Sequence, residues 1–175
     1  MRFLRSNRII IVIILCINPF TLLSQQKKTY HSQLLNADIN LLVYTDIKVL
    51  NLNDGSKGEI FIVLTPDKQF EYMITLVKKN EKLNFHKIKE REEFKEAYLK
   101  ECNCIIESES LLQYNSFLSF QLKTISNIKM QKLYGYVDSF VMNESMYSVI
   151  YLAPDANKFE KFKSEYKSFL RQIDK

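Results

Sequence analysis

Apolar and polar positions alternate through the first half of the chain in the manner of β-strands. Between 70 and 77, Phe70, Tyr72, Ile74 and Leu76 fall on one side and the intervening residues on the other. Three earlier segments are rich in β-branched and aromatic residues, and 53–58 (NDGSKG) has turn composition. The pattern predicts an antiparallel meander with strands at 39–45, 47–51, 59–65 and 70–77.

Spacings of three and four residues replace this alternation after the meander, which predicts an amphipathic helix. The helix is expected to begin at Lys87 or Glu90 and to end at Glu101. Its apolar stripe consists of Phe94, Ala97, Tyr98 and Leu99.

Strand patterns then resume, with Asn143 and Glu144 forming a tight link between the last two strands. A long hairpin is therefore expected at this link. The predicted strands are 104–108, 115–124, 130–142 and 146–152.

The clearest periodicity lies at the C-terminus and predicts a second helix. Asn157 and Glu160 form an N-cap and capping-box pair just after Pro154. The apolar stripe must be buried on the sheet, which offers the large apolar surface it needs. The fold class is therefore α+β, an antiparallel sheet of about six to seven strands packed against two helices. The stripe consists of Phe159, Phe162, Tyr166, Phe169, Leu170 and Ile173.

The N-terminus has the organisation of a secretory leader. Three arginines without an acidic residue precede the aliphatic run 9–16 (IIIVIILC). The apolar stretch 9–23 is shorter than the roughly 20 residues that a spanning helix needs. We therefore expect a signal peptide at 1–24 and a mature start at Gln25. A retained anchor formed by 9–23 is the alternative.

Cys16 raises the further alternative of a lipoprotein. Processing of lipoproteins prefers a small residue before the cysteine, and Leu15 occupies that position. The polar residues 25–37 are expected to form a flexible lead-in. The chain has 175 residues and few glycines or prolines, which favours a single α+β domain at 38–174.

Removal of the leader changes the charge balance. Without Arg2, Arg5 and Arg8, 22 basic residues face 20 acidic ones, a net charge of +2. Lysines and glutamates alternate along 87–101, which is typical of a solvated helix face. A nucleic-acid interface would need a basic stripe with interleaved aromatic residues, so no nucleic-acid partner is expected.

The end of the chain consists of the strand 146–152 (MYSVIYL), Pro154, Phe159, Phe162 and a closing helix that contains Ser168 and Phe169. This order resembles the PsbP-like family, an αβα sandwich with many small exported bacterial members. The resemblance implies a binding or assembly role and no shared catalytic residue.

Cys102 and Cys104 are the two cysteines of the mature chain, and three roles are open for them. They can form a disulfide, pack as free thiols on one face of a strand, or bind a metal. A structural zinc site needs four ligands, and only His31 and His86 are available elsewhere.

No recognised catalytic motif is present. His86 has no nucleophile that a motif ties to it, and the acidic pairs Glu92 with Glu93 and Glu107 with Glu109 lie on charged segments. The sequence therefore predicts a protein that is not an enzyme, with no cofactor and no metal.

The late strands are rich in tyrosine, which is favoured at protein interfaces. An exposed cluster would make Tyr134, Tyr136, Tyr147 and Tyr151 a contact surface. The alternative is that helices cover both faces of the sheet and place these residues in the core.

These patterns favour an exported envelope protein, periplasmic or secreted, that acts as a non-enzymatic binding or accessory module. Its partner is expected to be another envelope protein, with membrane contact only if the leader is retained. A carrier of a small apolar ligand and a thiol-active protein that uses Cys102 and Cys104 are the alternatives.

Overall fold

The computed structural model describes residues 27–51, 56–81, 83–128 and 131–174. The predicted signal peptide at 1–24, the alternative anchor at 9–23 and Cys16 lie outside these residues. In the ranges described, neither helix combines the length and the apolar character needed to cross a membrane.

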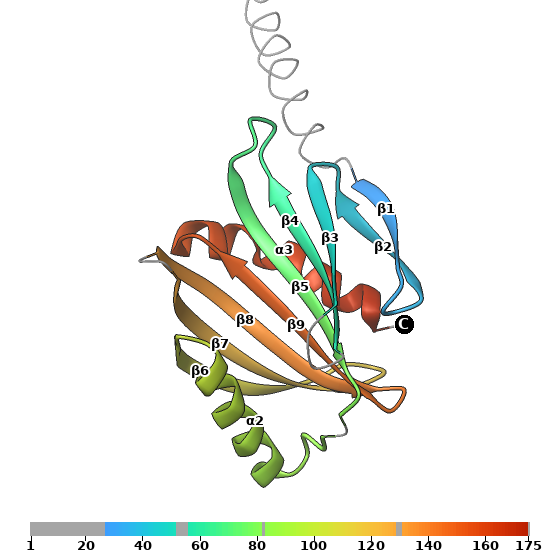
Figure 1. The fold of residues 1–175 in the computed structure, drawn as a ribbon, viewed down its shortest axis with the longest axis vertical. Helices are drawn as coiled ribbons and strands as arrows, with labels where there is room; N and C mark the ends of the chain where they lie inside the picture. Colours follow the sequence, from blue (N-terminus) through green and yellow to red (C-terminus); the bar gives the residue numbers. More distant parts are fainter. Residues whose placement is uncertain (1–26, 52–55, 82, 129–130, 175) are drawn as a thin grey trace, which may run out of the picture.

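Seven antiparallel strands form the main sheet, in the order β3-β4-β5-β9-β8-β7-β6 (Figure 1). The meander β3–β5 and the meander β6–β9 meet where β5 pairs with β9. The last strand of the chain therefore lies in the middle of the sheet. The strands are β3 (Thr45–Asn51), β4 (Lys57–Leu64), β5 (Phe70–Lys79), β6 (Cys104–Gln113), β7 (Leu118–Ile128), β8 (Gln131–Met142) and β9 (Ser145–Ala153).

The link between β8 and β9 is the predicted tight turn. Asn143 and Glu144 both have positive φ angles, of 49° and 62°. Two consecutive residues of this kind give the backbone twist that a two-residue hairpin requires. The hairpin holds β8 and β9 in register from Tyr134 opposite Ala153 to Met142 opposite Ser145.

The C-terminal helix α3 (Ala156–Ile173) packs against one face of the sheet and contacts β5, β8 and β9. Its buried residues are members of the predicted stripe: Phe159, Tyr166, Phe169, Leu170 and Ile173. The prediction that Asn157 caps this helix was wrong. Asp155 has extended backbone angles, and its carboxylate accepts a 2.8 Å hydrogen bond from the Lys158 amide, so the helix begins two residues earlier.

The helix α2 (Ile88–Glu101) lies on the opposite face and is held more loosely (Figure 1). Phe94 packs edge-on against Phe85 and Phe120, and Tyr98 joins the same cluster. No residue of α2 is fully buried. Ala97 and Leu99, which were predicted to share the apolar stripe, are exposed.

The predicted flexible lead-in at 25–37 was wrong for the residues described there. The strand β1 (Lys27–Ser32) pairs with β2 (Ala37–Leu42) as a separate two-stranded sheet. The hairpin packs one side on the core. On that side Tyr30 contacts Phe61, and Ile39 is fully buried. The domain therefore includes residues 27–37.

The same hairpin divides the strand predicted at 39–45. β2 ends at Leu42 and β3 begins at Thr45, whose hydroxyl donates a 2.7 Å hydrogen bond to the Leu42 carbonyl. The chain turns at this point and passes from the small sheet into the large one.

Glu59 on β4 ties the hairpin to the main sheet. Its side chain is 1% exposed and accepts hydrogen bonds from the Ser32 hydroxyl at 2.6 Å, the Gln33 amide at 2.9 Å and the Tyr30 hydroxyl at 3.3 Å. Buried charge is tolerated when it is hydrogen-bonded in this way. The carboxylate therefore fixes the turn between β1 and β2.

Replacing Glu59 by Ala is expected to lower the free energy of unfolding by about 3 kcal/mol, because several buried donors lose a charged acceptor. Urea denaturation measures this change. Glu81→Ala, which alters an exposed acidic residue, serves as the control and should stay within about 0.5 kcal/mol of wild type. An equally small effect of Glu59→Ala would contradict the anchoring role.

Candidate functional site

An open groove lies between α3 and the β6 end of the sheet. Its volume is about 520 Å³. Leu112 and Tyr114 form one wall, and Lys163, Lys167 and Arg171 of α3 form the other. The groove exists because α3 covers β5, β9 and β8 and leaves the same face of β7 and β6 open.

The β6–β7 hairpin is held alongside α3 at both ends of this groove. Near the start of α3, the Lys123 ammonium lies 5.9 Å from the centre of the Phe159 ring. Beyond its end, the Asp174 carboxylate accepts hydrogen bonds from the amides of Asn115 at 3.0 Å and Ser116 at 2.7 Å. The helix and the hairpin therefore run side by side along the groove.

The helical wall is basic. Residues four apart lie on one face of a helix, so Lys163, Lys167 and Arg171 form a row along the groove. Lys163 pairs with Glu160 at 3.4 Å and lies 5.6 Å above the Tyr136 ring. These neighbours raise the pKa of the Lys163 ammonium, with the hydrogen bond to Tyr136 as the main cause.

Lys167 and Arg171 differ from Lys163 because they are exposed. Within the described part of the chain, neither makes a hydrogen bond or an ion pair. Their charges therefore face solvent along the groove.

The floor is aromatic and polar. Tyr136, Tyr166 and Gln121 line it, and Tyr114 closes one end. Burial raises the pKa of Tyr114 to about 12, so its hydroxyl stays protonated at neutral pH. A groove with one basic wall and an aromatic floor suits an anionic ligand that also carries apolar groups.

Asp138 lies fully buried beneath this floor. Its carboxylate accepts hydrogen bonds from the Ser119 hydroxyl at 2.7 Å, from the Gln121 amide at 2.8 Å and from the Tyr166 hydroxyl. Burial raises the pKa of Asp138, and the three donors oppose that shift. The network links β7, β8 and α3 beneath the groove.

The pKa of Asp138 predicts how stability depends on pH. Because the folded-state pKa lies above the unfolded value of about 3.9, protonation favours the folded state. The contribution of Asp138 protonation to the free energy of unfolding is complete below the unfolded-state pKa. It is lost as the pH rises through the folded-state pKa. The unfolding free energy of wild type minus that of Asp138→Asn should therefore fall as the pH rises from about 4 to about 8.

Urea denaturation across this pH range measures the difference. The Asn variant serves as the control at each pH, because its side chain does not titrate and it shares all other titratable groups with wild type. A difference that rises with pH would contradict a raised pKa for Asp138.

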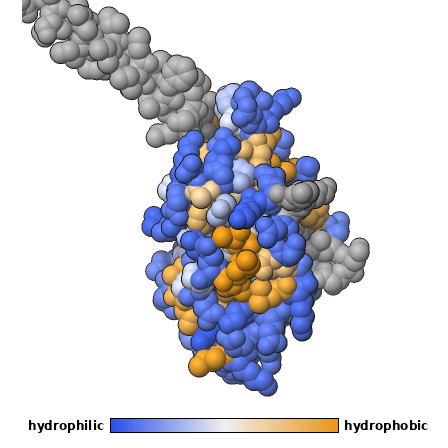
Figure 2. All heavy atoms as spheres, turned by 90° about the vertical axis from the view of Figure 1, so that its left-hand side faces the viewer, coloured by the Kyte–Doolittle hydropathy of each residue, from blue (hydrophilic) through white to orange (hydrophobic). Residues whose placement is uncertain are grey.

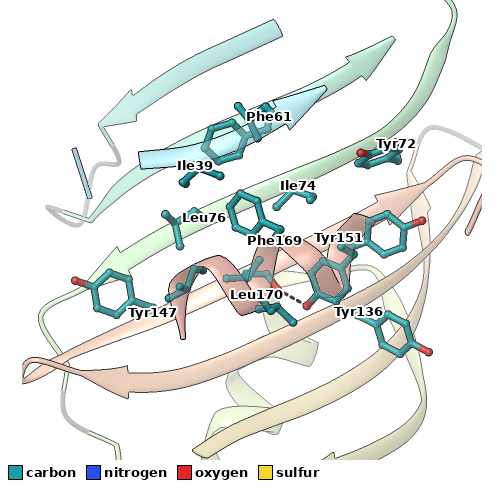
Figure 3. Close-up of a cluster of buried hydrophobic side chains, with 14 of the residues drawn as sticks. Ile39, Phe61, Tyr72, Ile74, Leu76, Tyr136, Tyr147, Tyr151, Phe169 and Leu170 are labelled. Carbon is teal, nitrogen blue, oxygen red and sulfur yellow. Dashed lines mark hydrogen bonds between the residues drawn. The ribbon is translucent and has the colours of Figure 1, made fainter. Parts of the chain in front are cut away.

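The four tyrosines expected as a contact surface do not form one. Tyr147 and Tyr151 are buried, Tyr136 is 9% exposed and Tyr134 is half-buried. Figure 3 shows three of them on the face of the sheet that carries Phe169 and Leu170 of α3. The stripe of α3 covers them, so the core interpretation is correct, and only Tyr136 lines the groove.

Cys102 and Cys104 form a disulfide where α2 ends and β6 begins. Neither side chain is fully buried. Cys104 lines a shallow, open hollow between α2 and β6. The bond therefore fastens the end of the loosely packed helix to the edge of the sheet.

Loss of this disulfide is expected to have a small effect on stability. A bond that closes three residues contributes about 1.6 kcal/mol in the chain-entropy relation. Cys102→Ser combined with Cys104→Ser should therefore lower the unfolding free energy by about that amount and speed amide exchange in α2. Reduced wild-type protein is the matched control, and loss of the whole fold in either sample would contradict this assignment.

The outer side of β6 and α2 carries an apolar patch in a largely polar surface (Figure 2). Among the described residues, the exposed large hydrophobic side chains of these elements include Leu99 and Ile105, which is 63% exposed. β6 is also an edge strand, so its outer backbone groups have no strand partner in the sheet.

The remaining sequence candidates lie apart from one another. His31 pairs with Asp38 at 2.8 Å on the exposed hairpin, and His86 is exposed before α2. In the part of the chain described, no group of three or more potential ligands could hold a metal.

The acidic pairs form ordinary ion pairs with lysines. Glu92 and Glu109 both contact Lys95, and Glu107 contacts Lys123 at 2.9 Å. Glu93 pairs with Lys89 within α2. These carboxylates therefore support the surface of α2 and β6.

The sequence reasoning missed the groove and its cations. The spacing of four between Lys163, Lys167 and Arg171 was available as a signal, but it matches the solvated face of any amphipathic helix. Asp138 and Glu59 each stand in an apolar strand, and an acid in that position is a signal of a buried polar network.

Solved structures with similar folds share very little sequence with this chain. Cyanobacterial PsbP (CyanoP) from Synechocystis sp. PCC 6803 superposes with a TM-score of 0.61 at 6% identity, covering 83% of this chain and 90% of that one. The chain has the PsbP-like fold. No protein-family model and no curated protein matches it by sequence.

Two further structures show the same architecture. The Ran-binding protein Mog1p of Saccharomyces cerevisiae has a TM-score of 0.54 at 11% identity. The superposition covers 84% of this chain and 94% of the Mog1p chain. A Pseudomonas aeruginosa protein of unknown function has a TM-score of 0.53 at 7% identity and covers 83% and 94%. At such identities the likeness concerns the fold alone, so function must be argued from the groove.

Proposed function

We propose that the protein is a non-enzymatic binding or accessory module of the cell envelope, and that it binds another protein through the groove between α3 and β6. The observation that carries the proposal is the row of cations on α3, two of which make no hydrogen bond or ion pair with another described residue. Surface charge of this kind attracts and orients a partner of opposite charge.

The fold is compatible with this role. One protein with the same architecture is described as Ran-binding, which shows that the scaffold can carry a protein interface.

A carrier of a small apolar ligand is less well supported. The space between α3 and the sheet near Phe61, Ile74 and Phe169 is about 20 Å³, which is room for about one water molecule. Small-molecule sites usually have several hundred Å³, and the larger groove is open and basic. The described interior is therefore filled by the protein's own side chains.

Photo-crosslinking tests the proposal in cells that produce the full chain. A photoreactive amino acid at position 167 is expected to give one dominant crosslinked protein in the envelope fraction. The same amino acid at position 100, an exposed site on α2, is the matched control and should give none. Mass spectrometry of the product identifies the partner and is expected to show a mature N-terminus at Gln25.

Two outcomes would contradict separate parts of the proposal. Equal crosslinking from positions 167 and 100, or none from either, would count against the groove as a protein-binding site. Recovery of the uncleaved chain outside the envelope fraction would count against export. A crosslinked product that disappears when Cys102 is replaced by Ser would instead support the thiol-active alternative.

A further inference from the structure

The row of cations on α3 has a defined repeat. Four residues of helix rise by about 6 Å, so Lys163, Lys167 and Arg171 recur at that distance along the groove. In an extended strand, side chains on one side recur every two residues, or about 6.6 to 6.8 Å. Carboxylates at alternate positions of an extended segment therefore match the cations in spacing.

The two walls differ in chemistry, which adds a sequence preference. Leu112 and Tyr114 lie on the β6 wall opposite the cations. Successive side chains of a strand point in opposite directions. A strand between these walls would direct one set of side chains toward the cations and the other toward Leu112 and Tyr114.

The acidic groups of the groove leave its cations available. Asp174 is occupied by the amides of Asn115 and Ser116, and Asp138 is buried under Gln121 and Tyr166. Glu160 pairs with Lys163 at 3.4 Å. The positive charge of Lys167 and Arg171 is therefore open to carboxylates from another molecule.

From the spacing and the two unlike walls, we infer that the groove binds an extended segment of a partner protein in which acidic residues alternate with apolar ones. This inference rests on the proposed function and names the partner's chemistry. Its acidic side chains pair with the cations of α3, and its apolar side chains pack on the β6 wall.

Fluorescence anisotropy with a labelled synthetic peptide tests the inference on the purified mature protein. The peptide alternates three glutamates with valines, and a second peptide of the same composition groups the glutamates together. The alternating peptide should bind at least about tenfold more tightly to wild type than to Lys167→Glu combined with Arg171→Glu, since two attractive pairs become repulsive. Lys100→Glu on α2 is the matched charge control and should bind like wild type.

A peptide of opposite charge separates loss of binding from loss of folding, because a misfolded variant would bind neither peptide. The Lys167→Glu, Arg171→Glu variant is expected to bind a peptide that alternates lysines with valines more tightly than wild type does. Equal binding of the alternating and the grouped glutamate peptides, or an unchanged affinity in the double variant, would overturn the inference. Tighter binding of a single-stranded oligonucleotide than of the acidic peptide would overturn it as well.

The two proposals fail in different ways. A partner crosslinked from position 167 together with no binding of the alternating peptide would reject the segment chemistry and keep the protein-binding groove. Failure of both experiments would reject the groove as a binding site.

Discussion

The width of the sheet, compared with that of one helix, is the constraint from which the rest of the structure follows. Seven strands about 4.8 Å apart span about 29 Å, whereas a helix covers about 10 Å. The aromatic stripe of α3 lies over the centre, where Tyr151 stacks with Phe159 and Tyr166. The β1–β2 hairpin covers the β4 side, held there by Glu59. Nothing described covers β6 and β7 on the face that carries α3, and the groove is what remains.

The same constraint explains the buried network. At the edge of α3, where the face of the sheet becomes open, polar atoms of the sheet lie between protein and solvent. Asp138 satisfies the hydroxyls of Ser119 and Tyr166 at that boundary, so the edge of the helix is fixed by hydrogen bonds as well as by packing. Precise placement of α3 matters because the cations of the groove are part of this helix.

Much of the fold was predictable because strand alternation and helical spacing report burial directly. The hairpin at Asn143 and Glu144 and the stripe of α3 were predicted correctly. The hairpin at 27–37 was not, because its polar outer face hides the few residues that pack inward, such as Tyr30. The cap at Asp155 was missed because two neighbouring residues were both suitable caps, and only the backbone angles distinguish them.

The candidate site was less predictable than the fold. It joins residues near 112 to residues near 167, and no local pattern reports such a distant pairing. The tyrosines of the late strands were recognised as either a contact surface or core residues, and the choice between the two depended on where α3 lies. The surface residues that line a site can be identified only when the uncovered part of the sheet is known.

The central position of β9 has a consequence for how the molecule is made. β9 and α3 follow all the other described elements along the chain, yet β9 separates β5 from β8 and α3 covers all three. The two meanders cannot join until the residues from Ser145 onward have been synthesised, so the pairing of β5 and β8 with β9 forms late in folding.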